Sequence, residues 1–350
     1  MLLYIHIPFC DSKCYYCAFN SYVDKFHLKN SYMQALCNQL EFELKRFDVV
    51  AKEIEALFIG GGTPSCVEAK LYKKLFEMLS PYLKDGIEIT TEANPNSANK
   101  EWLSQMHNLG VNRVSFGVQS FNDAKLKLLN RAHSSKQAKE AIINAKEVGF
   151  TNISLDIIYA TLGDTKELLE EDLSIAFSLP INHLSAYALT IEEATPFALK
   201  PYMSKERLTI TKWLFKKIEK AGFKQYEISN FGSYKSVHNM GYWQYKDYIG
   251  LGSGAVGKMD MNRFYPTTNL EEYIINPLDI RVEVLTEEDK KSEQIFLGFR
   301  SCVGLNKNLL NTNELKRADI LVYEKKLTLK DGIYYNNNYL LADEVALFIS

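Results

Sequence analysis

Residues 2–21 read LLYIHIPFCDSKCYYCAFNS, an apolar run typical of a strand that leads directly into three closely spaced cysteines. Cys10, Cys14 and Cys17 have the spacing CxxxCxxC. Three thiolates on one short loop can hold three irons of a cubic 4Fe-4S cluster, whereas clusters that only transfer electrons usually take four cysteines. This stretch therefore predicts a cluster with one iron left open to a ligand from outside the chain.

A zinc or thiol-redox site is the alternative interpretation of these cysteines. Cys14 and Cys17 alone form CxxC, and a zinc ion would need His6 or a distant residue as its fourth ligand. A zinc ribbon would also contain a second cysteine pair. The other cysteines are instead scattered along the chain, at Cys37, Cys66 and Cys302. Their scatter favours the iron-sulfur interpretation.

The composition is that of a globular protein with a sizeable core. The 350 residues are 46% hydrophobic and 12% aromatic, which is enough for one large domain and a smaller one. The 41 Lys and Arg balance 43 Asp and Glu, so the net charge of -2 argues against broad electrostatic binding to nucleic acid. The sequence shows no secretory leader pattern and no run of 18 apolar residues that could span a membrane. Its clustered cysteines suit a reducing compartment, where thiols stay free to bind a metal. We therefore expect a cytoplasmic protein.

Strand and helix patterns alternate along the first 222 residues. Amphipathic helical periodicity runs, for example, from Met33 to Phe47, from Leu71 to Tyr82 and from Leu208 to Ile218. The predicted strands cover residues 2–7, 56–59, 87–91, 112–118, 153–158 and 183–189. Six strand-helix units predict an α/β fold with a parallel sheet, and they are too few for a closed eight-stranded barrel.

Polar residues follow several of these strands at their carboxyl ends, where parallel barrels gather their reactive groups. A glycine turn, residues 60–63, follows the second strand, and glycines let a ligand approach the backbone closely. Glu92 ends the third strand, Gln119 ends the fourth and Asp156 lies in the fifth. Glu92 can accept hydrogen bonds from a ribose diol, and Arg131 can pair with a carboxylate. Taken singly, each of these residues is more often a solvated or capping residue.

The cysteine loop resembles that of the radical S-adenosylmethionine superfamily, in which the open iron chelates the methionine part of the cofactor. The resemblance implies a three-quarter barrel, the partial (β/α)6 TIM-like fold, and it agrees with the count of six units. It also implies that Gly61, Gly62 and Thr63 form the motif that contacts the methionine amine. The same resemblance places these further residues at the cofactor or its neighbours: Tyr4, Tyr16, Glu92, Gln119, Arg131 and Asp156.

One branch of the superfamily matches more closely, the HemN/HemW family of oxygen-independent coproporphyrinogen III dehydrogenases and related heme chaperones. The motifs that carry this resemblance are YIHIPFC, GGGTPS, EANP, GVQSF and NRAH, and the likeness runs over nearly the whole chain. The dehydrogenases have a fourth cysteine two positions beyond the triad, where this chain has Phe19. They also carry an N-terminal arm before the first strand. The chain therefore resembles the heme chaperones more than the dehydrogenases.

Residues 237–243, VHNMGYW, match the HNxxYW motif of the heme chaperones. A neutral histidine can ligate heme iron and aromatic rings can pack on a porphyrin, so His238 is a candidate heme ligand. The alternative is a structural histidine with Tyr242 and Trp243 in the core. The chain departs from the family at Ala18, in residues 157–164 (IIYATLGD) and at Val256, which replaces a common histidine.

The pattern changes after residue 286. A helix through Ile295 and Phe299, a second helix near residues 313–325 and a hairpin at Asp331 and Gly332 resemble a small α+β winged-helix-like domain. We therefore expect a radical S-adenosylmethionine barrel with its cluster loop in residues 1–225, a connecting segment in 226–285 and this small domain in 286–350. A lid or partner surface suits the small domain better than DNA binding.

The resemblance implies a heme chaperone that binds heme, a 4Fe-4S cluster and S-adenosylmethionine and delivers heme to respiratory apoproteins, at the cytoplasmic face of the membrane. The rival function is oxidative decarboxylation of porphyrinogen propionates by a 5′-deoxyadenosyl radical. We expect no such oxidase activity and assign no catalytic residue. Neither the electron donor nor the oligomeric state follows from the sequence, and no nucleic-acid partner is expected.

Overall fold

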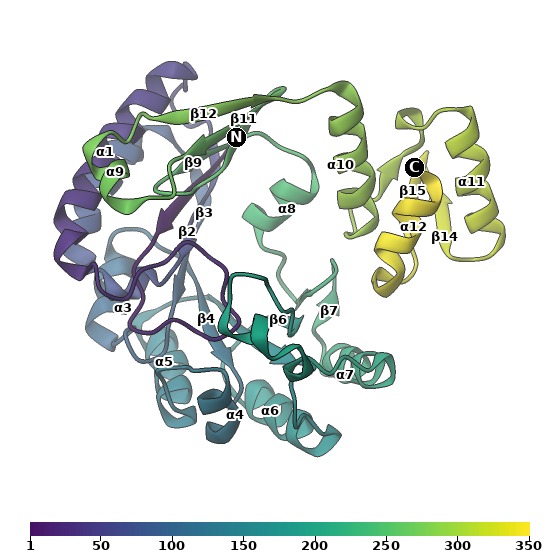
Figure 1. Ribbon diagram of the computed structural model, residues 1–350, viewed down its shortest axis with the longest axis horizontal. Helices are drawn as coiled ribbons and strands as arrows, with labels where there is room; N and C mark the ends of the chain where they lie inside the picture. Colours follow the sequence, from purple (N-terminus) through teal and green to yellow (C-terminus); the bar gives the residue numbers. More distant parts are fainter.

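The computed structural model describes residues 1–350 and has a mixed α/β fold built on one large sheet. Its six central strands are β1 (Leu2–Ile7), β2 (Ile54–Gly61), β3 (Leu83–Ala93), β4 (Arg113–Gln119), β5 (Asn152–Tyr159) and β6 (His183–Ala188). They are parallel and follow one another in chain order, as repeated strand-helix units predict. The sheet curves without closing, which confirms the partial barrel (Figure 1).

Helices cover the outer, convex face of these strands (Figure 1). They are α1 (Lys29–Arg46), α2 (Lys73–Leu79), α3 (Lys100–Asn108), α4 (Asp123–Leu128), α5 (Ser135–Val148), α6 (Lys166–Ser178) and α7 (Leu208–Lys220). Helix α5 illustrates how the sequence sets their limits. Ser134 and Gln137 form a capping box at its start, and Gly149 ends it with a φ of 116°. The apolar faces of the helices and strands bury one continuous core.

Two elements differ from the sequence-based expectation. The second strand runs on through Gly60 and Gly61, which pair with His6 and Ile7 of β1, so the turn begins later than predicted. The single helix expected through residues 71–82 is a short α2 between two 3-10 turns. The second of these turns contains Pro81, whose ring and missing N–H do not allow an α-helix to continue.

Residues 226–285, expected as a connecting segment, supply strands to both sides of the large sheet. On one side β8 (Asn230–Gly232) pairs with β6, and β7 (Lys224–Gln225), which precedes this segment, pairs with β8. On the other side lie β9 (Tyr248–Leu251), β10 (Gly257–Met259), β11 (Asn262–Pro266) and β12 (Ile280–Val284). Helix α9 (Leu270–Ile275) packs near α1, whereas α8 (Val237–Trp243) lies inside the curve of the sheet (Figure 1).

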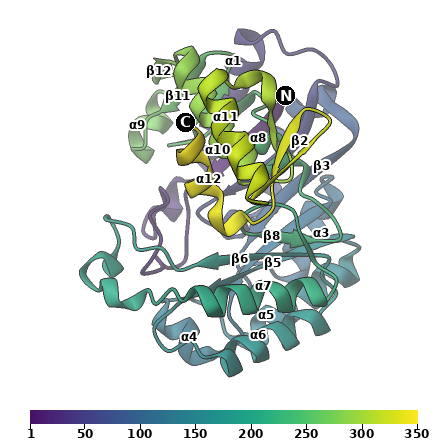
Figure 2. The same ribbon diagram turned by 90° about the vertical axis from the view of Figure 1, so that its right-hand side faces the viewer.

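The C-terminal part forms a small α+β unit beside the barrel (Figure 1), and Figure 2 shows this unit from its outer side, in front of the sheet. It contains α10 (Glu287–Phe299), α11 (Thr312–Tyr323), α12 (Ala342–Ile349), β13 (Leu305–Asn306), β14 (Leu327–Lys330) and β15 (Ile333–Asn336). Its apolar residues bury a core of their own. The predicted hairpin is present, and Asp331 and Gly332 take φ angles of 52° and 77°, as a tight two-residue turn requires. No helix anywhere in the protein is both long and apolar enough to cross a bilayer.

Candidate functional site

The carboxyl ends of the parallel strands surround a cavity of about 600 Å³. All but two of the residues that the sequence predicts for the site line it: Cys10, Cys14, Tyr16, Cys17, Gly61, Gly62, Thr63, Glu92, Gln119, Arg131 and Asp156. The two exceptions are Tyr4 and His238. Because these residues come from separate strands and loops, the fold alone brings them together.

The cysteine loop leaves β1 and is anchored at both ends. The backbone N–H of Cys10 donates to the carbonyl of Tyr22 at 3.0 Å, and the N–H of Tyr22 donates to the carbonyl of Pro8 at 2.7 Å. Within the loop, the ammonium of Lys13 donates to the carbonyl of Phe19 at 2.6 Å. Burial raises the pKa of the Cys17 thiol above its usual value. A thiol in such a place becomes a thiolate only with a compensating positive partner, such as iron.

The thiols fit a multinuclear cluster better than a single ion. All six cysteines are free, and nowhere do three His, Cys, Asp or Glu side chains lie close enough to hold one metal ion together. A 4Fe-4S cluster spreads its ligands over separate irons, so it needs thiols around a larger volume. Cys10 and Cys14 are both 8% exposed and face the same cavity. The residues present therefore fit the cluster that their spacing predicts.

The glycine turn at the end of β2 forms one wall of the cavity. A Cβ on Gly62 would lie 2.8 Å from the carbonyl oxygen of Ile7 and 2.9 Å from that of Phe9, so this position has no room for a side chain. The N–H of Gly61 donates to the carboxylate of Glu92 at 3.1 Å. Thr63 follows, and its hydroxyl lies 3.4 Å from the thiol of Cys10. The turn is thus fitted closely to the cysteine loop.

Two carboxyl groups lie on the inner face of the sheet. Burial, and to a smaller extent the charge of Asp156, raises the pKa of Glu92 to about 7. Burial likewise raises the pKa of Asp156. If both were charged in this cavity without a cation, the two carboxylates would repel each other. A ligand that brings hydroxyls or a positive charge would relieve both effects, which suits a sulfonium or ribose group.

Arg131 joins the cysteine loop to the strands. Its guanidinium donates to Asn94 Oδ1 at 2.6 Å, to the carbonyl of Gly117 at 2.6 Å and to Cys14 Sγ at 3.2 Å. Its buried Nε has no hydrogen-bond partner, and neither has the buried Oε1 of Gln119. Unpartnered buried polar atoms are costly unless a ligand satisfies them. These two atoms therefore mark this wall as a binding surface for a polar ligand.

The sequence analysis missed several polar residues of the cavity, among them Asn94, Ser115 and Tyr187. Asn94 lies in the quoted EANP motif, and its amide donates to the hydroxyl of Thr63 at 3.0 Å. Ser115 stands directly beside Glu92 in the register of β3 and β4. Tyr187 comes from β6, lines the cavity and is 41% exposed. The register of β3 and β4 would have placed Ser115 beside Glu92 in advance, but only with strand boundaries that are accurate to a single residue.

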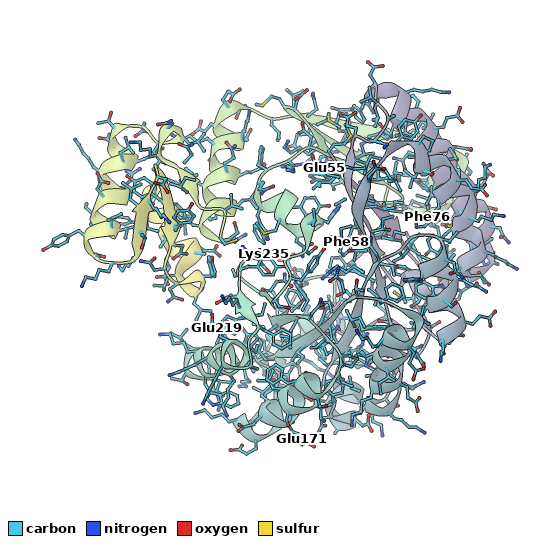
Figure 3. The ribbon with its side chains drawn as sticks, turned by 180° about the vertical axis from the view of Figure 1, so that it is seen from behind. Glu55, Phe58, Phe76, Glu171, Glu219 and Lys235 are labelled. Carbon is cyan, nitrogen blue, oxygen red and sulfur yellow. The ribbon has the colours of Figure 1, made fainter.

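Tyr4 and His238 lie apart from the cavity lining, inside the curve of the sheet. The hydroxyl of Tyr4 is 2.9 Å from His6 Nδ1, so it supports the first strand. The ring of Phe58, which Figure 3 labels, has its centroid 6.3 Å from that of Tyr4 and 5.2 Å from that of His238. The ring of Tyr242 packs edge-on against His238 at 4.8 Å. The imidazole is therefore enclosed by aromatic rings.

The imidazole of His238 is 1% exposed, and neither of its nitrogens has a hydrogen-bond partner. Burial lowers its pKa to about 3, so the ring is neutral at physiological pH. Helix α8 is held in place by Glu88, whose carboxylate accepts from the Val237 N–H at 2.9 Å and the His238 N–H at 3.1 Å. Hydroxyls of Tyr234 and Ser236 donate to the same carboxylate. A ligand can reach His238 only if α8 moves.

Comparison with known proteins gives a consistent family assignment. Residues 4–176 match the radical SAM superfamily. The chain is 36% identical over 328 residues to the heme chaperone HemW of Bacillus subtilis strain 168, covering 87% of this chain and 84% of that protein. It is 33% identical over 349 residues to HemW of Buchnera aphidicola from Acyrthosiphon pisum, covering 96% and 92%. Against HemW of Escherichia coli K12 the identity is 37%, with 73% and 70% covered.

A solved structure has the same fold over almost the entire chain. It is the coproporphyrinogen III oxidase HemN of Escherichia coli, described as a radical SAM enzyme, with a TM-score of 0.84. The alignment covers 99% of this chain and 89% of that chain at 20% identity. At this identity the likeness establishes the shared architecture, including the C-terminal unit.

Proposed function

Because this chain belongs to the radical S-adenosylmethionine superfamily and, within it, to the family of the heme chaperone HemW, we propose that it binds a 4Fe-4S cluster, S-adenosylmethionine and heme and delivers the heme to respiratory apoproteins. The proposed binding of the cluster and of S-adenosylmethionine rests on one observation: the cysteine triad, the glycine turn and the buried acids all line the same cavity. The family assignment carries the heme part.

In this proposal Cys10, Cys14 and Cys17 hold the cluster. When bound, the cluster and S-adenosylmethionine together supply one-electron reducing chemistry at the cavity. The guanidinium of Arg131 already donates to Cys14 Sγ, so it would steady one ligating sulfur and add positive charge beside the cluster. Lys13 would hold the loop closed behind Cys17 through its contact with the Phe19 carbonyl.

The remaining cavity residues are proposed to hold S-adenosylmethionine. Glu92 and Asp156 would accept hydrogen bonds from its hydroxyls and offset its positive charge, and Gln119 would use its free Oε1. The free Nε of Arg131 is suited to a carboxylate. Gly61 and Gly62, with Thr63, would leave room for the methionine end. Tyr16 lines the same cavity and would contact the cofactor directly. Tyr4 lies outside the cavity lining, so it would affect the cofactor only indirectly, through its contact with His6.

Heme binding is the less direct part of the proposal. His238 has a free lone pair and flat aromatic neighbours, but its enclosure means that heme ligation there requires α8 to leave its place against β2. Four donors from residues 234–238 to Glu88 oppose that movement. A different heme ligand would leave the chaperone function intact.

We propose that delivery takes place in the cytoplasm, to apoproteins at the cytoplasmic face of the membrane. The second candidate function is that of an oxygen-independent coproporphyrinogen III oxidase, favoured by the shared HemN fold. Phe19, 68% exposed at the cavity mouth, stands where the dehydrogenases have a fourth cysteine, and this difference supports the chaperone.

Both functions can be tested on one preparation. Anaerobically reconstituted protein is incubated with coproporphyrinogen III, a reductant and S-adenosylmethionine, and a second portion is titrated with heme. We expect saturable heme uptake near one per chain without protoporphyrinogen. Formation of protoporphyrinogen would instead select the oxidase, and failure of both assays would contradict the whole proposal.

A further inference from the structure

A second cavity, of about 290 Å³, lies at the end of β5 and shares no lining residue with the larger cavity that contains the cysteine triad. Its walls are the loop from β5 to α6, in residues 160–165, and residues 205–211 at the start of α7. Helices α6 and α7 lie side by side there (Figure 2). Ile158 lines the larger cavity and Tyr159 lines the smaller one, because successive residues of a strand face opposite sides.

Backbone hydrogen bonds hold the two walls of the small cavity together. The N–H of Leu162 donates to the carbonyl of Met203 at 2.7 Å, and the N–H of Lys205 donates to the carbonyl of Ala160 at 2.7 Å. These contacts join two segments that are about forty residues apart in the chain. The cavity is therefore formed by the fold itself and does not need a ligand to assemble it.

The charges around the small cavity favour an anion. Asp164 is the one acidic residue of its lining, and the buried ammonium of Lys125 lies 2.8 Å from that carboxylate and balances its charge. Lys205 and Arg207 also line the cavity, and neither side chain takes part in an ion pair within the protein. Glu206 lies between them in the chain but is exposed and is not part of the lining. The lining therefore has a surplus of positive charge.

The start of α7 adds hydrogen-bond donors to this wall. No side chain caps this helix of 13 residues, and its first turn contains no acidic residue. The first N–H groups of a helix have no partner within the helix, and they carry a partial positive charge. Helix α6 differs, because the hydroxyl of Thr165 caps it and Glu167 lies in its first turn. Of these two helices, only α7 leaves its first N–H groups to a ligand.

Thr161 gives independent evidence for a ligand in the small cavity. This residue belongs to the lining and is 2% exposed, and its hydroxyl oxygen has no hydrogen-bond partner. A buried hydroxyl without a partner is costly unless a ligand or water satisfies it. Phosphate carries several acceptor oxygens, so it can accept from this hydroxyl and from the cationic side chains at the same time.

We propose that the small cavity binds a phosphate group, either as free phosphate or as part of a small phosphomonoester. Lys205 and Arg207 hold the phosphate oxygens, while the Thr161 hydroxyl and the first N–H groups of α7 donate to them. The volume of about 290 Å³ suits a phosphate with a few attached carbons and is too small to enclose a heme. This site is independent of the proposed cluster and S-adenosylmethionine site, since the two cavities share no residue.

The test is calorimetric titration of the full chain with inorganic phosphate and, separately, with glycerol 3-phosphate, at an ionic strength fixed with sodium chloride. We expect saturable binding near one phosphate per chain. Arg207→Ala and Lys205→Ala should each weaken it by about tenfold or more, because each removes a charge-assisted contact. Thr161→Val keeps the shape of the side chain without the hydroxyl and should also weaken binding. Lys220→Ala, at the far end of α7, is the matched control and should bind like the wild type.

Two further comparisons separate this site from the cofactor site. Arg131→Ala should bind phosphate normally, and Arg207→Ala should bind S-adenosylmethionine normally, because each residue lines only one of the two cavities. Failure of the cofactor proposal would therefore leave the phosphate titration unaffected. The ester identifies the source of the phosphate: binding as tight as that of free phosphate indicates a phosphomonoester, and binding of free phosphate alone indicates the inorganic anion.

Hydrogen exchange gives a readout at the proposed donors themselves. Added phosphate should slow exchange of the amides of Leu208 and Thr209, which begin α7, and should do so less in Arg207→Ala. A wild type that binds neither phosphate nor the ester would overturn the proposal. So would binding that Arg207→Ala and Lys205→Ala both leave unchanged, or binding that Lys220→Ala weakens as much as they do.

Discussion

The guanidinium of Arg131 donates a hydrogen bond to the thiol sulfur of Cys14 across 3.2 Å, although 117 residues separate the two in the chain. The same guanidinium binds Asn94 and the carbonyl of Gly117, so one side chain connects the cysteine loop with β3 and β4. A change at Arg131 therefore acts on the cluster loop and on the polar wall together.

Replacing Cys14 should remove the cluster. Cys14→Ser takes away one of the three thiols of the cysteine loop, so anaerobic reconstitution should lose most of the iron and the broad visible absorption of an iron-sulfur cluster. Iron and sulfide analysis measures the loss. Cys302→Ser is the control, since Cys302 lies in the loop after α10 and should leave the cluster intact. Four irons retained by Cys14→Ser, or zinc as the sole metal of the wild type, would refute the ligand assignment.

Replacing Arg131 should weaken binding of S-adenosylmethionine to the cluster-loaded protein. Arg131→Ala removes a charge-assisted contact worth roughly 1.5 to 3 kcal/mol, which corresponds to a loss in affinity of about tenfold or more. Calorimetric titration measures it, with iron content confirming that both proteins carry clusters. Arg207→Ala changes an exposed arginine elsewhere and should bind normally. Normal binding by the alanine variants of Arg131, Glu92, Gln119 and Asp156 alike would remove the cofactor from this cavity.

Glu92 should make the cofactor-free protein less stable as pH rises. Its pKa is about 7 in the folded protein, above the usual value of 4.5. Between pH 4.5 and pH 7 the folded state therefore keeps a proton on Glu92 that the unfolded state has lost. Stability therefore falls between about pH 4.5 and 7 and is level above. Glu92→Gln should remove this loss, which has an upper bound of about 3 kcal/mol. Urea unfolding at pH 5 and pH 8 measures it, with Glu206→Gln as an exposed control.

If His238 ligates heme, replacing it should change the heme spectrum. His238→Phe keeps an aromatic ring against Phe58 and Tyr242 but removes both nitrogens, so it tests ligation with little loss of packing. We expect a shifted Soret band and weaker heme uptake in an absorbance titration. His107→Ala serves as the control because His107 lies on α3, away from α8. An unchanged spectrum would discard His238 as the ligand and keep the chaperone.

Glu88 should govern how firmly α8 is held. Glu88→Ala leaves the donors at the start of α8 without their buried acceptor, which should cost about 2 to 4 kcal/mol in the free energy of unfolding. Glu88→Gln keeps one acceptor oxygen and should cost less. Urea denaturation measures both variants. Equal stability of Glu88→Ala and the wild type would mean that the contacts of α8 with β2 suffice to hold it.

Sequence by itself determined the features that depend on neighbours along the chain. The spacing of Cys10, Cys14 and Cys17 and the glycine turn after β2 are local patterns, and the periodicity of two or 3.6 residues reports which elements form. The exact ends of the elements depend also on pairing between strands, since β2 extends through Gly60 and Gly61 because these residues pair with β1. Six strand-helix units were enough to predict an open parallel barrel and the edge at which polar residues gather.

Tertiary structure alone decided which side chains touch. Tyr187 lines the cavity because β6 ends beside β5, and His238 of the HNxxYW motif is enclosed because α8 packs inside the sheet, with this imidazole against Phe58. The free edge at β12 likewise follows from strand order, which periodicity does not encode. The physical reason is that a residue's exposure and partners depend on register and packing between segments far apart in sequence. A local pattern fixes only the face of the element on which that residue lies.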